Sequence, residues 1–227
     1  MLKYYLIAFI TLIAAYLTGS INFAVIFTKN ARGVDVRNFG SGNAGATNVL
    51  RVAGKKTAAA TFACDFLKGA LSSALGFFVC EFYLFPGSLD FSHTISFSQP
   101  QFNPIYGAFF CGAACMLGHC WPVFFGFKGG KAAATGVGIF AFCCLPAAAI
   151  GLLAFAVCFI ITRKVSLGSL IATVVISVAT IAAVCLNYFG EINKTVIAAV
   201  TLGMAALVFY RHRSNIERLL SGKEKDI

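Results

Sequence analysis

The polar stretch from Gly40 to Arg51 has the composition best suited to chemistry on an anion. It combines several glycines with Ser41, Asn43 and Arg51, and it lies between two long apolar runs. Glycines allow backbone N–H groups to crowd around an anion, while serine, asparagine and arginine side chains supply directional donors. Such a loop beside a membrane predicts a site for a phosphorylated substrate.

A second polar segment, residues 118–131, ends in a Gly-Gly-Lys turn. A turn of this kind at the start of a helix can hold phosphate through backbone N–H groups and the helix dipole. The same turn is also common in ordinary loops, and His119 equally fits a capping or packing role.

The third polar segment is the tail, residues 211–227, where His212 and Asn215 are three residues apart and share one helix face. The arginines around them also suit simple anchoring to anionic lipid headgroups. Residues 163–170 add Ser169 to the set. What favours a functional site is that all these segments are rich in anion ligands and poor in carboxylates.

Two nucleotide-binding motifs are matched only superficially. Residues 40–45 fit GxGxxG, but a dinucleotide fold needs a soluble βαβ unit there, and both flanks run into apolar spans. Residues 126–131 have three residues between their outer glycines, where a Walker loop requires four. Both matches are interpreted as coincidence.

Composition fixes the class of protein. Of 227 residues, 59% are hydrophobic and 11% charged, which indicates a membrane protein with several spans. The net charge of +10 comes from basic residues in short loops between apolar runs, a placement typical of cytoplasmic loops, so no nucleic-acid partner is expected. The nine cysteines form no CxxC pair or zinc-type cluster, and neither a metal nor a cofactor is predicted.

The charge distribution predicts the topology. The first apolar run, Tyr4–Phe27, has Lys3 upstream and six Lys or Arg residues between 29 and 56 downstream, which places the N-terminus outside and residues 28–56 inside. Residues 85–104 lack Lys and Arg and are expected to form an external loop. Further spans are expected near residues 57–84, 105–125, 165–186 and 196–210.

Residues 132–162 fit either one long span or two short ones bent at Pro146. Two segments return every basic cluster to the inside, although about 15 residues at ~1.5 Å each are short for a ~30 Å core. The expected fold is a single all-α membrane domain, residues 1–227, with seven transmembrane helices, some of them short or re-entrant, N-terminus out and C-terminus in. The cytoplasmic parts are residues 28–56, 118–131, 163–170 and 211–227.

The acidic residues are few. Asp65 and Lys68 are three residues apart at the start of the second span and predict a structural ion pair. Asp35, Asp90 and Glu191 are interpreted as solvated loop residues.

Four sets of residues follow one another along nearly the whole chain. They are Gly19–Asn22, Gly33–Arg37, Gly40–Asn43 and Thr47–Arg51 (motif 1), Gly118-His119, Pro122, Phe124 and Phe127–Lys131 (motif 2), Ser166–Leu170, and Arg211-His212, Asn215-Ile216, Arg218-Leu219 and Gly222 (motif 3). In this order they resemble the motifs of the bacterial acyl-phosphate:glycerol-3-phosphate acyltransferases.

The resemblance implies a seven-helix enzyme of the bacterial inner membrane with its site at the cytoplasmic face. It would move a fatty acyl group from acyl phosphate to glycerol 3-phosphate, with membrane lipid and the soluble enzyme that makes acyl phosphate as further partners. It assigns catalysis to His212, Asn215 and Ser41. It assigns substrate binding to Asn43, Arg51, Gly129, Gly130, Lys131 and Ser169.

One departure from the family pattern concerns the second motif. The family usually follows Gly-Gly-Lys with glycine, where this chain has Ala132. Alanine adopts positive φ less readily than glycine, so the geometry of this loop is an open question.

The main alternative function is a transporter of a phosphorylated metabolite. It predicts ionisable residues deep in the spans, and Glu81 is the one residue well along a span that could serve. The choice between His212 and the substrate phosphate as the base is also open at this stage.

Overall fold

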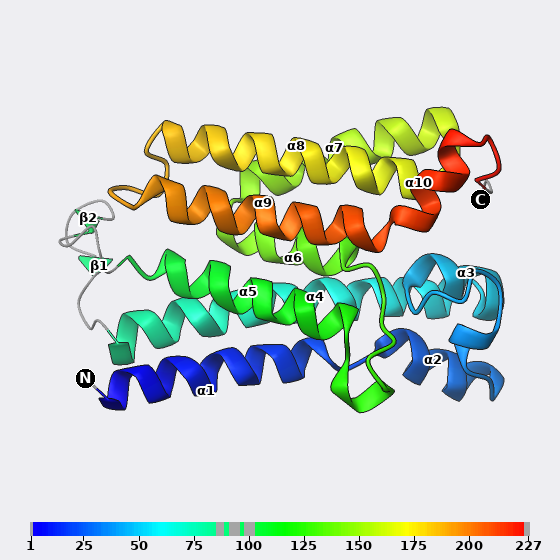
Figure 1. Ribbon diagram of the computed structural model, residues 1–227, viewed down its shortest axis with the longest axis horizontal. Helices are drawn as coiled ribbons and strands as arrows, with labels where there is room; N and C mark the ends of the chain where they lie inside the picture. The colour runs from blue at the N-terminus through cyan, green and yellow to red at the C-terminus, as the bar shows by residue number, and fades with distance from the viewer. Residues whose placement is uncertain (1, 85–88, 91–95, 98–102, 225–227) are drawn as a thin grey trace.

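The computed structural model describes residues 2–84, 89–90, 96–97 and 103–224. Its long helices lie side by side along the longest axis of the molecule (Figure 1). They are α1 (Leu2–Gly19), α4 (Lys55–Val79), α5 (Ile105–Cys120), α7 (Leu145–Thr162), α8 (Val165–Cys185) and α9 (Lys194–Arg211). In the described part of the chain, six helical segments are long and apolar enough to cross a membrane.

Shorter elements complete the chain. The short helices are α2 (Phe23–Arg32), α3 (Ala46–Ala53), α6 (Ala133–Cys143) and α10 (Arg213–Leu220), with 3-10 turns η1 (Val36–Asn38) and η4 (Val123–Phe125) and a π-helical turn η2 (Cys80–Leu84). A minimal antiparallel ladder pairs β1 (Leu89–Asp90) with β2 (Ser96–Phe97), and all other regular elements in the described part of the chain are helical. The remainder of the predicted external loop, residues 85–104, lies largely outside the described residues.

The first predicted span is interrupted. The chain leaves the helix after Gly19, and Asn22 caps α2 by accepting a hydrogen bond from Val25 N–H at 3.2 Å. The carbonyl of Ile21, freed by the break, accepts a hydrogen bond from Lys68 Nζ at 2.9 Å. A polar side chain on a neighbouring helix thus satisfies the backbone group that the break exposes within the bundle.

The expected break in residues 132–162 is present, two residues before Pro146. The residue between the two helices is Cys144, and Pro146 lies in the first turn of α7, where its missing N–H is not needed. With 11 residues, α6 is only ~16 Å long, about half of a ~30 Å hydrocarbon core.

Small residues allow the helices to pack closely around α4. A Cβ at Gly138 of α6 would lie 1.9 Å from the Phe66 carbonyl oxygen, and one at Gly76 would lie 2.0 Å from the Gly107 carbonyl oxygen. Such contacts are typical of helix packing in membranes, where small residues let backbones approach.

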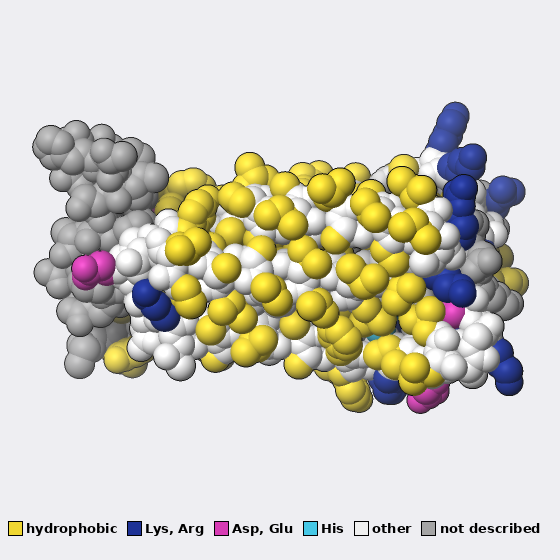
Figure 2. Space-filling model, turned by 90° about the horizontal axis from the view of Figure 1, so that it is seen from above, with side chains coloured by type: hydrophobic (Ala, Val, Ile, Leu, Met, Phe, Trp, Pro, Cys, Tyr) yellow, Lys and Arg dark blue, Asp and Glu magenta, His cyan; other side chains and the backbone are white. Residues whose placement is uncertain are grey.

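The outer surface is apolar along most of its length. Figure 2 shows apolar side chains over the middle of one face, with Lys and Arg gathered at one end. That end carries α2, α3, α10 and the C-terminus, whereas β1, β2 and the N-terminus lie at the other (Figure 1). The three polar segments singled out in the sequence therefore meet at the basic end of the bundle.

Candidate functional site

A polar cleft opens at the basic end and is walled by all three segments. Its cationic side chains are Arg37, Lys128, Lys131, Arg211, Arg213 and Arg218. Asp35 is the one acidic residue that lines it within the described chain. This excess of positive charge suits the binding of anions.

The first wall is the turn that carries Ser41 and Asn43, and both residues line the cleft. Gly40 and Gly42 have φ values of 60° and 70°, a conformation that glycine adopts without strain. The N–H of Gly42 donates to the Phe39 carbonyl at 3.0 Å. The predicted glycine loop thus forms a tight turn that presents two polar side chains.

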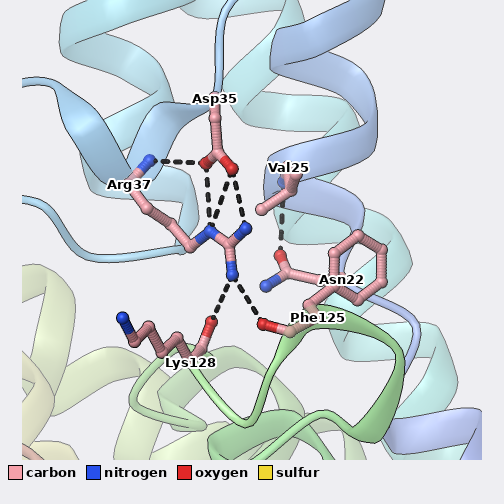
Figure 3. A network of polar contacts seen from close by, with 6 residues as sticks. All are labelled: Asn22, Val25, Asp35, Arg37, Phe125 and Lys128. Carbon is pink, nitrogen blue, oxygen red and sulfur yellow. Dashed lines mark hydrogen bonds and ion pairs between the residues drawn. The ribbon is translucent and has the colours of Figure 1, made fainter.

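Arg37, which is paired with Asp35, joins this wall to the second segment. Arg37 contacts Asp35 at 2.7 Å, and its other terminal nitrogen donates to the carbonyls of Phe125 at 2.7 Å and Lys128 at 3.4 Å (Figure 3). The hydrogen bond from Arg37 holds the pKa of Asp35 below its ordinary value. Asp35 thus lies in a loop and is partly exposed, but it is not the isolated acid expected, because its carboxylate pairs with the Arg37 side chain that bonds to the second segment. Glu191 is exposed, as expected, and the side chain of Asp90 lies outside the described residues.

The two glycines of the second segment are held from behind by Arg211. Its guanidinium donates to the carbonyls of Gly129 and Gly130, both at 3.0 Å. Gly130 N–H donates to the His119 carbonyl at 3.1 Å, and a Cβ at Gly130 would lie 2.2 Å from His119 Nε2. Close packing therefore requires glycine here, and the Gly130 N–H is already used within the protein.

The turn ends at Ala132, which has a φ of 59° and is almost fully buried. This is the left-handed conformation that glycine tolerates and alanine adopts at a cost. The chain therefore places a strained alanine where the family pattern has glycine.

Lys131 lines the cleft and contacts the buried side chain of Asn215. Lys131 Nζ donates to Asn215 Oδ1, and Asn215 Nδ2 donates to Glu224 Oε1 at 2.5 Å. Burial lowers the pKa of Lys131 to about 8, and the nearby Arg218 adds to the shift. The pKa of Lys131 thus lies close to neutral pH, and a bound anion would stabilise the charged ammonium.

Glu224 is the common acceptor of three side-chain donors. It accepts hydrogen bonds from Ser166 Oγ at 2.7 Å and Arg218 Nε at 2.7 Å as well as from Asn215. Burial alone would raise the pKa of Glu224, but these hydrogen bonds outweigh it and lower the pKa. The tail is thereby folded back onto α8 and α9.

His212 is buried at the end of α9 and does not line the cleft. Its Nδ1 is 2.8 Å from the Val208 carbonyl oxygen, an acceptor, which assigns the proton to Nδ1 and leaves Nε2 as an acceptor. Burial lowers the pKa of His212 to about 4, although the hydrogen bond to the Val208 carbonyl alone would raise it. The imidazole is therefore neutral at physiological pH.

A buried charge cluster supports the second segment. Lys68 Nζ lies 2.8 Å from Asp65 Oδ1, which confirms the predicted ion pair, and His119 Nδ1 lies 3.5 Å from the same oxygen. Thr135 Oγ1 on α6 is 3.2 Å from His119 Nδ1. The cluster thus joins α4, α5 and α6 beneath the glycine turn, and His119 packs as the structural alternative expected.

Four of the nine predicted site residues line the cleft, and Gly130, His212, Asn215, Arg51 and Ser169 do not. Arg51 is exposed on α3, close enough to contribute to the lowered pKa of Lys131. Ser169 donates its hydroxyl to the Val165 carbonyl at 2.9 Å and lines a separate cavity.

That cavity is apolar, has a volume of about 100 Å³ and lies among α4, α5, α6, α7, α8 and α9. Met116, Phe140, Ile176 and Met204 line it deep in the bundle, while Ala133 and Ser169 line it near the basic end. Its lining thus includes Ala133, two residues after the cleft residue Lys131, and continues into the membrane-spanning part. Among the residues that the structure describes, no group of three or more His, Cys, Asp or Glu side chains could hold a metal ion.

Sequence reasoning missed the residues that hold the walls together. Asp35, Arg37 and Asn48 shape the first wall, and Arg211 and Glu224 shape the second and third. Motif membership was the one available signal for most of them. Glu224 lies two residues beyond Gly222, and nothing in the sequence indicated its role except that acidic residues are rare in this chain.

Fold and site together define a helical membrane protein with a cationic cleft at one end and an apolar cavity within the bundle. A sequence model described as glycerol-3-phosphate acyltransferase matches residues 9–222. The chain is 41% identical to the glycerol-3-phosphate acyltransferase of Thermoanaerobacter sp. (strain X514), over 97% of this chain and 96% of the relative. It is 39% identical to that of Aquifex aeolicus (strain VF5), over 96% and 97%.

Solved structures agree. The crystal structure of PlsY (YgiH), an integral membrane glycerol 3-phosphate acyltransferase, in its glycerol 3-phosphate form superposes with a TM-score of 0.78 at 36% identity, covering 97% of this chain and 95% of that one. The lysophosphatidic acid form gives 0.74 at 34% identity over the same shares. The chain belongs to the glycerol-3-phosphate acyltransferase family, which confirms the resemblance found in its motifs.

Proposed function

We propose that this protein moves a fatty acyl group from acyl phosphate to glycerol 3-phosphate, giving lysophosphatidic acid and phosphate. The observation that carries the proposal is a cationic cleft at one end of a bundle that also encloses an apolar cavity: Lys131 lines the cleft, and Ala133, two residues later, lines the cavity. The cleft suits two phosphate groups and the cavity suits an acyl chain. The solved relative is described in a form with glycerol 3-phosphate and a form with lysophosphatidic acid, the acceptor and product of such a reaction.

The reaction needs little covalent help from the protein. The hydroxyl oxygen of glycerol 3-phosphate forms a bond to the acyl carbonyl carbon, and the bond from that carbon to the phosphate oxygen breaks. Because phosphate is a good leaving group, the site has to align the two anions and stabilise the developing charge. Lys131, Arg51 and the cations of the cleft supply that charge, with Ser41, Asn43 and Asn215 as directional partners.

The proton of the attacking hydroxyl goes to the phosphate group of the donor in this proposal. With a pKa of about 4, His212 is a weak base at neutral pH, whereas the second pKa of a phosphate monoester is ~6. His212 Nε2 is a neutral acceptor that can orient the hydroxyl. Gly129 and Gly130 serve by letting the loop approach closely, and Ser169 lines the apolar cavity proposed for the acyl chain.

The proposed setting is the bacterial inner membrane, with seven spanning helices in one domain, the N-terminus outside and the cleft and C-terminus at the cytoplasmic face. The charge distribution supports it. In the part of the chain that the structure describes, Lys3 and Lys194 lie at the far end and Lys68 is buried, while the other Lys and Arg residues gather at the cleft end. The cytoplasmic side is also where a soluble enzyme would deliver acyl phosphate.

The test measures synthesis of lysophosphatidic acid by purified protein in lipid nanodiscs. The protein is given labelled glycerol 3-phosphate and one of three donors: acyl phosphate, acyl-CoA or acylated acyl carrier protein. Lysophosphatidic acid is expected with acyl phosphate alone. Efficient turnover of acyl-CoA in the absence of acyl phosphate would overturn the assignment of the donor. Uptake of glycerol 3-phosphate into sealed vesicles without any acyl product would instead support the transporter.

A further inference from the structure

Asn48 is a buried amide that makes three hydrogen bonds to the first wall of the cleft. Its side chain is 1% exposed. Its Oδ1 accepts from Ser41 N–H at 2.8 Å, and its Nδ2 donates to the carbonyls of Val36 and Phe39, both at 2.9 Å. The amide thus uses both donors and its acceptor on one loop.

The glycine turn is wrapped tightly around this amide. Gly40 has a φ of 60°, and a Cβ there would lie 2.2 Å from Asn48 Oδ1. The turn fits only because residue 40 has no side chain. The conformation that presents Ser41 and the position of Asn48 therefore depend on each other.

The same side chain also fixes the loop to α3. Asn48 lies in the first turn of α3, whose N-cap Gly45 provides no side-chain cap, and Arg51 follows three residues later on the same helix. One buried amide thus links η1, the glycine turn and the helix that carries Arg51.

We infer that Asn48 is a positioning residue for acyl transfer: it holds the Ser41–Asn43 turn against α3, so that Ser41 meets the substrate from a fixed place. This inference rests on the proposed function of the cleft. No other side chain of similar size offers two donors and one acceptor. An aspartate carries at most one proton, so at least one of the Val36 and Phe39 carbonyls would lose its donor.

Asn103 provides a matched control at the opposite end of the molecule. It is 0% exposed, its Nδ2 donates to the Phe189 carbonyl at 2.9 Å, and its Oδ1 accepts from Ile105 N–H at 2.9 Å. A purely structural role would make the two asparagines equivalent. The experiment compares Asn48→Asp and Asn48→Ala with Asn103→Asp and Asn103→Ala in nanodiscs, measuring thermal unfolding together with kcat and KM of the folded protein.

Both pairs of variants are expected to unfold at lower temperature. The Asn48 variants alone are expected to lose roughly 10- to 100-fold in kcat/KM, because a misplaced turn weakens contacts to the reacting groups. The Asn103 variants should stay within about twofold of the wild type. Equal kinetic losses in both pairs, or none in the Asn48 pair, would overturn the inference.

A double-mutant cycle distinguishes action through Ser41 from a general effect. If Asn48 acts by placing Ser41, the double variant Ser41→Ala/Asn48→Ala should be little worse than the poorer single variant. Multiplying losses, or normal kinetics in Ser41→Ala, would contradict the inference. Failure of the wild type itself to form lysophosphatidic acid would reject the proposed function, and this inference with it.

Discussion

Lys131 links the electrostatics of the cleft to a measurable pH dependence. Its pKa is lowered to about 8, chiefly by burial, so the ammonium of the free protein is lost as pH rises through that value. Because kcat/KM reports the free protein, it should fall on the alkaline side with an apparent pKa near 8. The phosphate groups of the substrates titrate near ~6 and cannot produce this limb.

The control for that limb is Lys131→Arg, since a guanidinium stays charged at all accessible pH values. The variant should lose the limb near 8 even if its activity is lower overall. The same fall in the Lys131→Arg profile would show that another group titrates. The measurement is kcat/KM for glycerol 3-phosphate between pH 6 and pH 10 in one buffer series.

A second prediction separates substrate contact from surface charge. Arg51→Ala and Lys131→Ala should each lower kcat/KM by roughly 30- to 1,000-fold, because charge-assisted bonds to a phosphate are lost. Lys223→Ala, which removes an exposed lysine of the tail, should change it less than twofold. Initial rates at subsaturating glycerol 3-phosphate measure all three. Similar losses in all of them would mean that general positive charge, and not a defined site, matters.

At this scale the sequence identified the residues that face the cleft better than those that support it. Ser41, Asn43 and Lys131 could be found because their types suit anions and their motifs were intact. Arg37, Arg211 and Glu224 act on backbone carbonyls or on one another across many residues of sequence. Such pairings follow from tertiary contacts, which spacing along the chain does not encode.

Among the elements, the turn that opens α6 shows the sharpest departure from local preference. Ala132 has a φ of 59°, where an L-residue is strained and glycine is not. We expect Ala132→Gly to stabilise the folded protein by up to ~1 kcal/mol. Ala133→Gly, at the first residue of the helix, should instead destabilise it by less than ~1 kcal/mol, because glycine loses more backbone entropy on folding than alanine.

Thermal unfolding of both variants in the same lipid or detergent tests this pair, and the opposite signs are the diagnostic result. A loss of stability in Ala132→Gly would show that the buried methyl group contributes more than the backbone strain costs. Sequence comparison with the family pattern located this position, but alanine by itself carries no sign of left-handed backbone.

The helix boundaries illustrate what hydrophobicity can and cannot predict. Length left either one long span or two short ones bent at Pro146 for residues 132–162, and the break between α6 and α7 was preferred because two segments return every basic cluster to the inside. The break after Gly19 was missed because residues 4–27 form one span-length apolar run. It depends on Lys68 satisfying the Ile21 carbonyl from another helix, which local sequence does not reveal.

The whole molecule is polarised, with its cations at one end and a largely uncharged far end. This supports a cleft at the cytoplasmic face, and labelling can test it. In a cysteine-free background, a membrane-impermeant maleimide added to intact cells should modify Glu191→Cys, in the exposed turn between α8 and α9, but not Ser221→Cys in the exposed tail. Both sites should react after permeabilisation. The reverse pattern in intact cells would invert the proposed orientation.

The unequal lengths of α6 and α7 set how deep the chemistry takes place. The two helices are consecutive and packed together, and α7 returns to the basic end with seven more residues than α6, 18 against 11. At ~1.5 Å per residue, the start of α6 and Lys131 beside it therefore lie ~10 Å below the level at which α7 ends. An acyl donor can keep its chain immersed in the bilayer while its phosphate is held there. Moving one methylene of the acyl chain from hydrocarbon to water costs ~0.8 kcal/mol of transfer free energy. In the proposed reaction, the short helix therefore lets the water-soluble acceptor reach the donor at the depth of the lipid, and the acyl chain does not have to enter water.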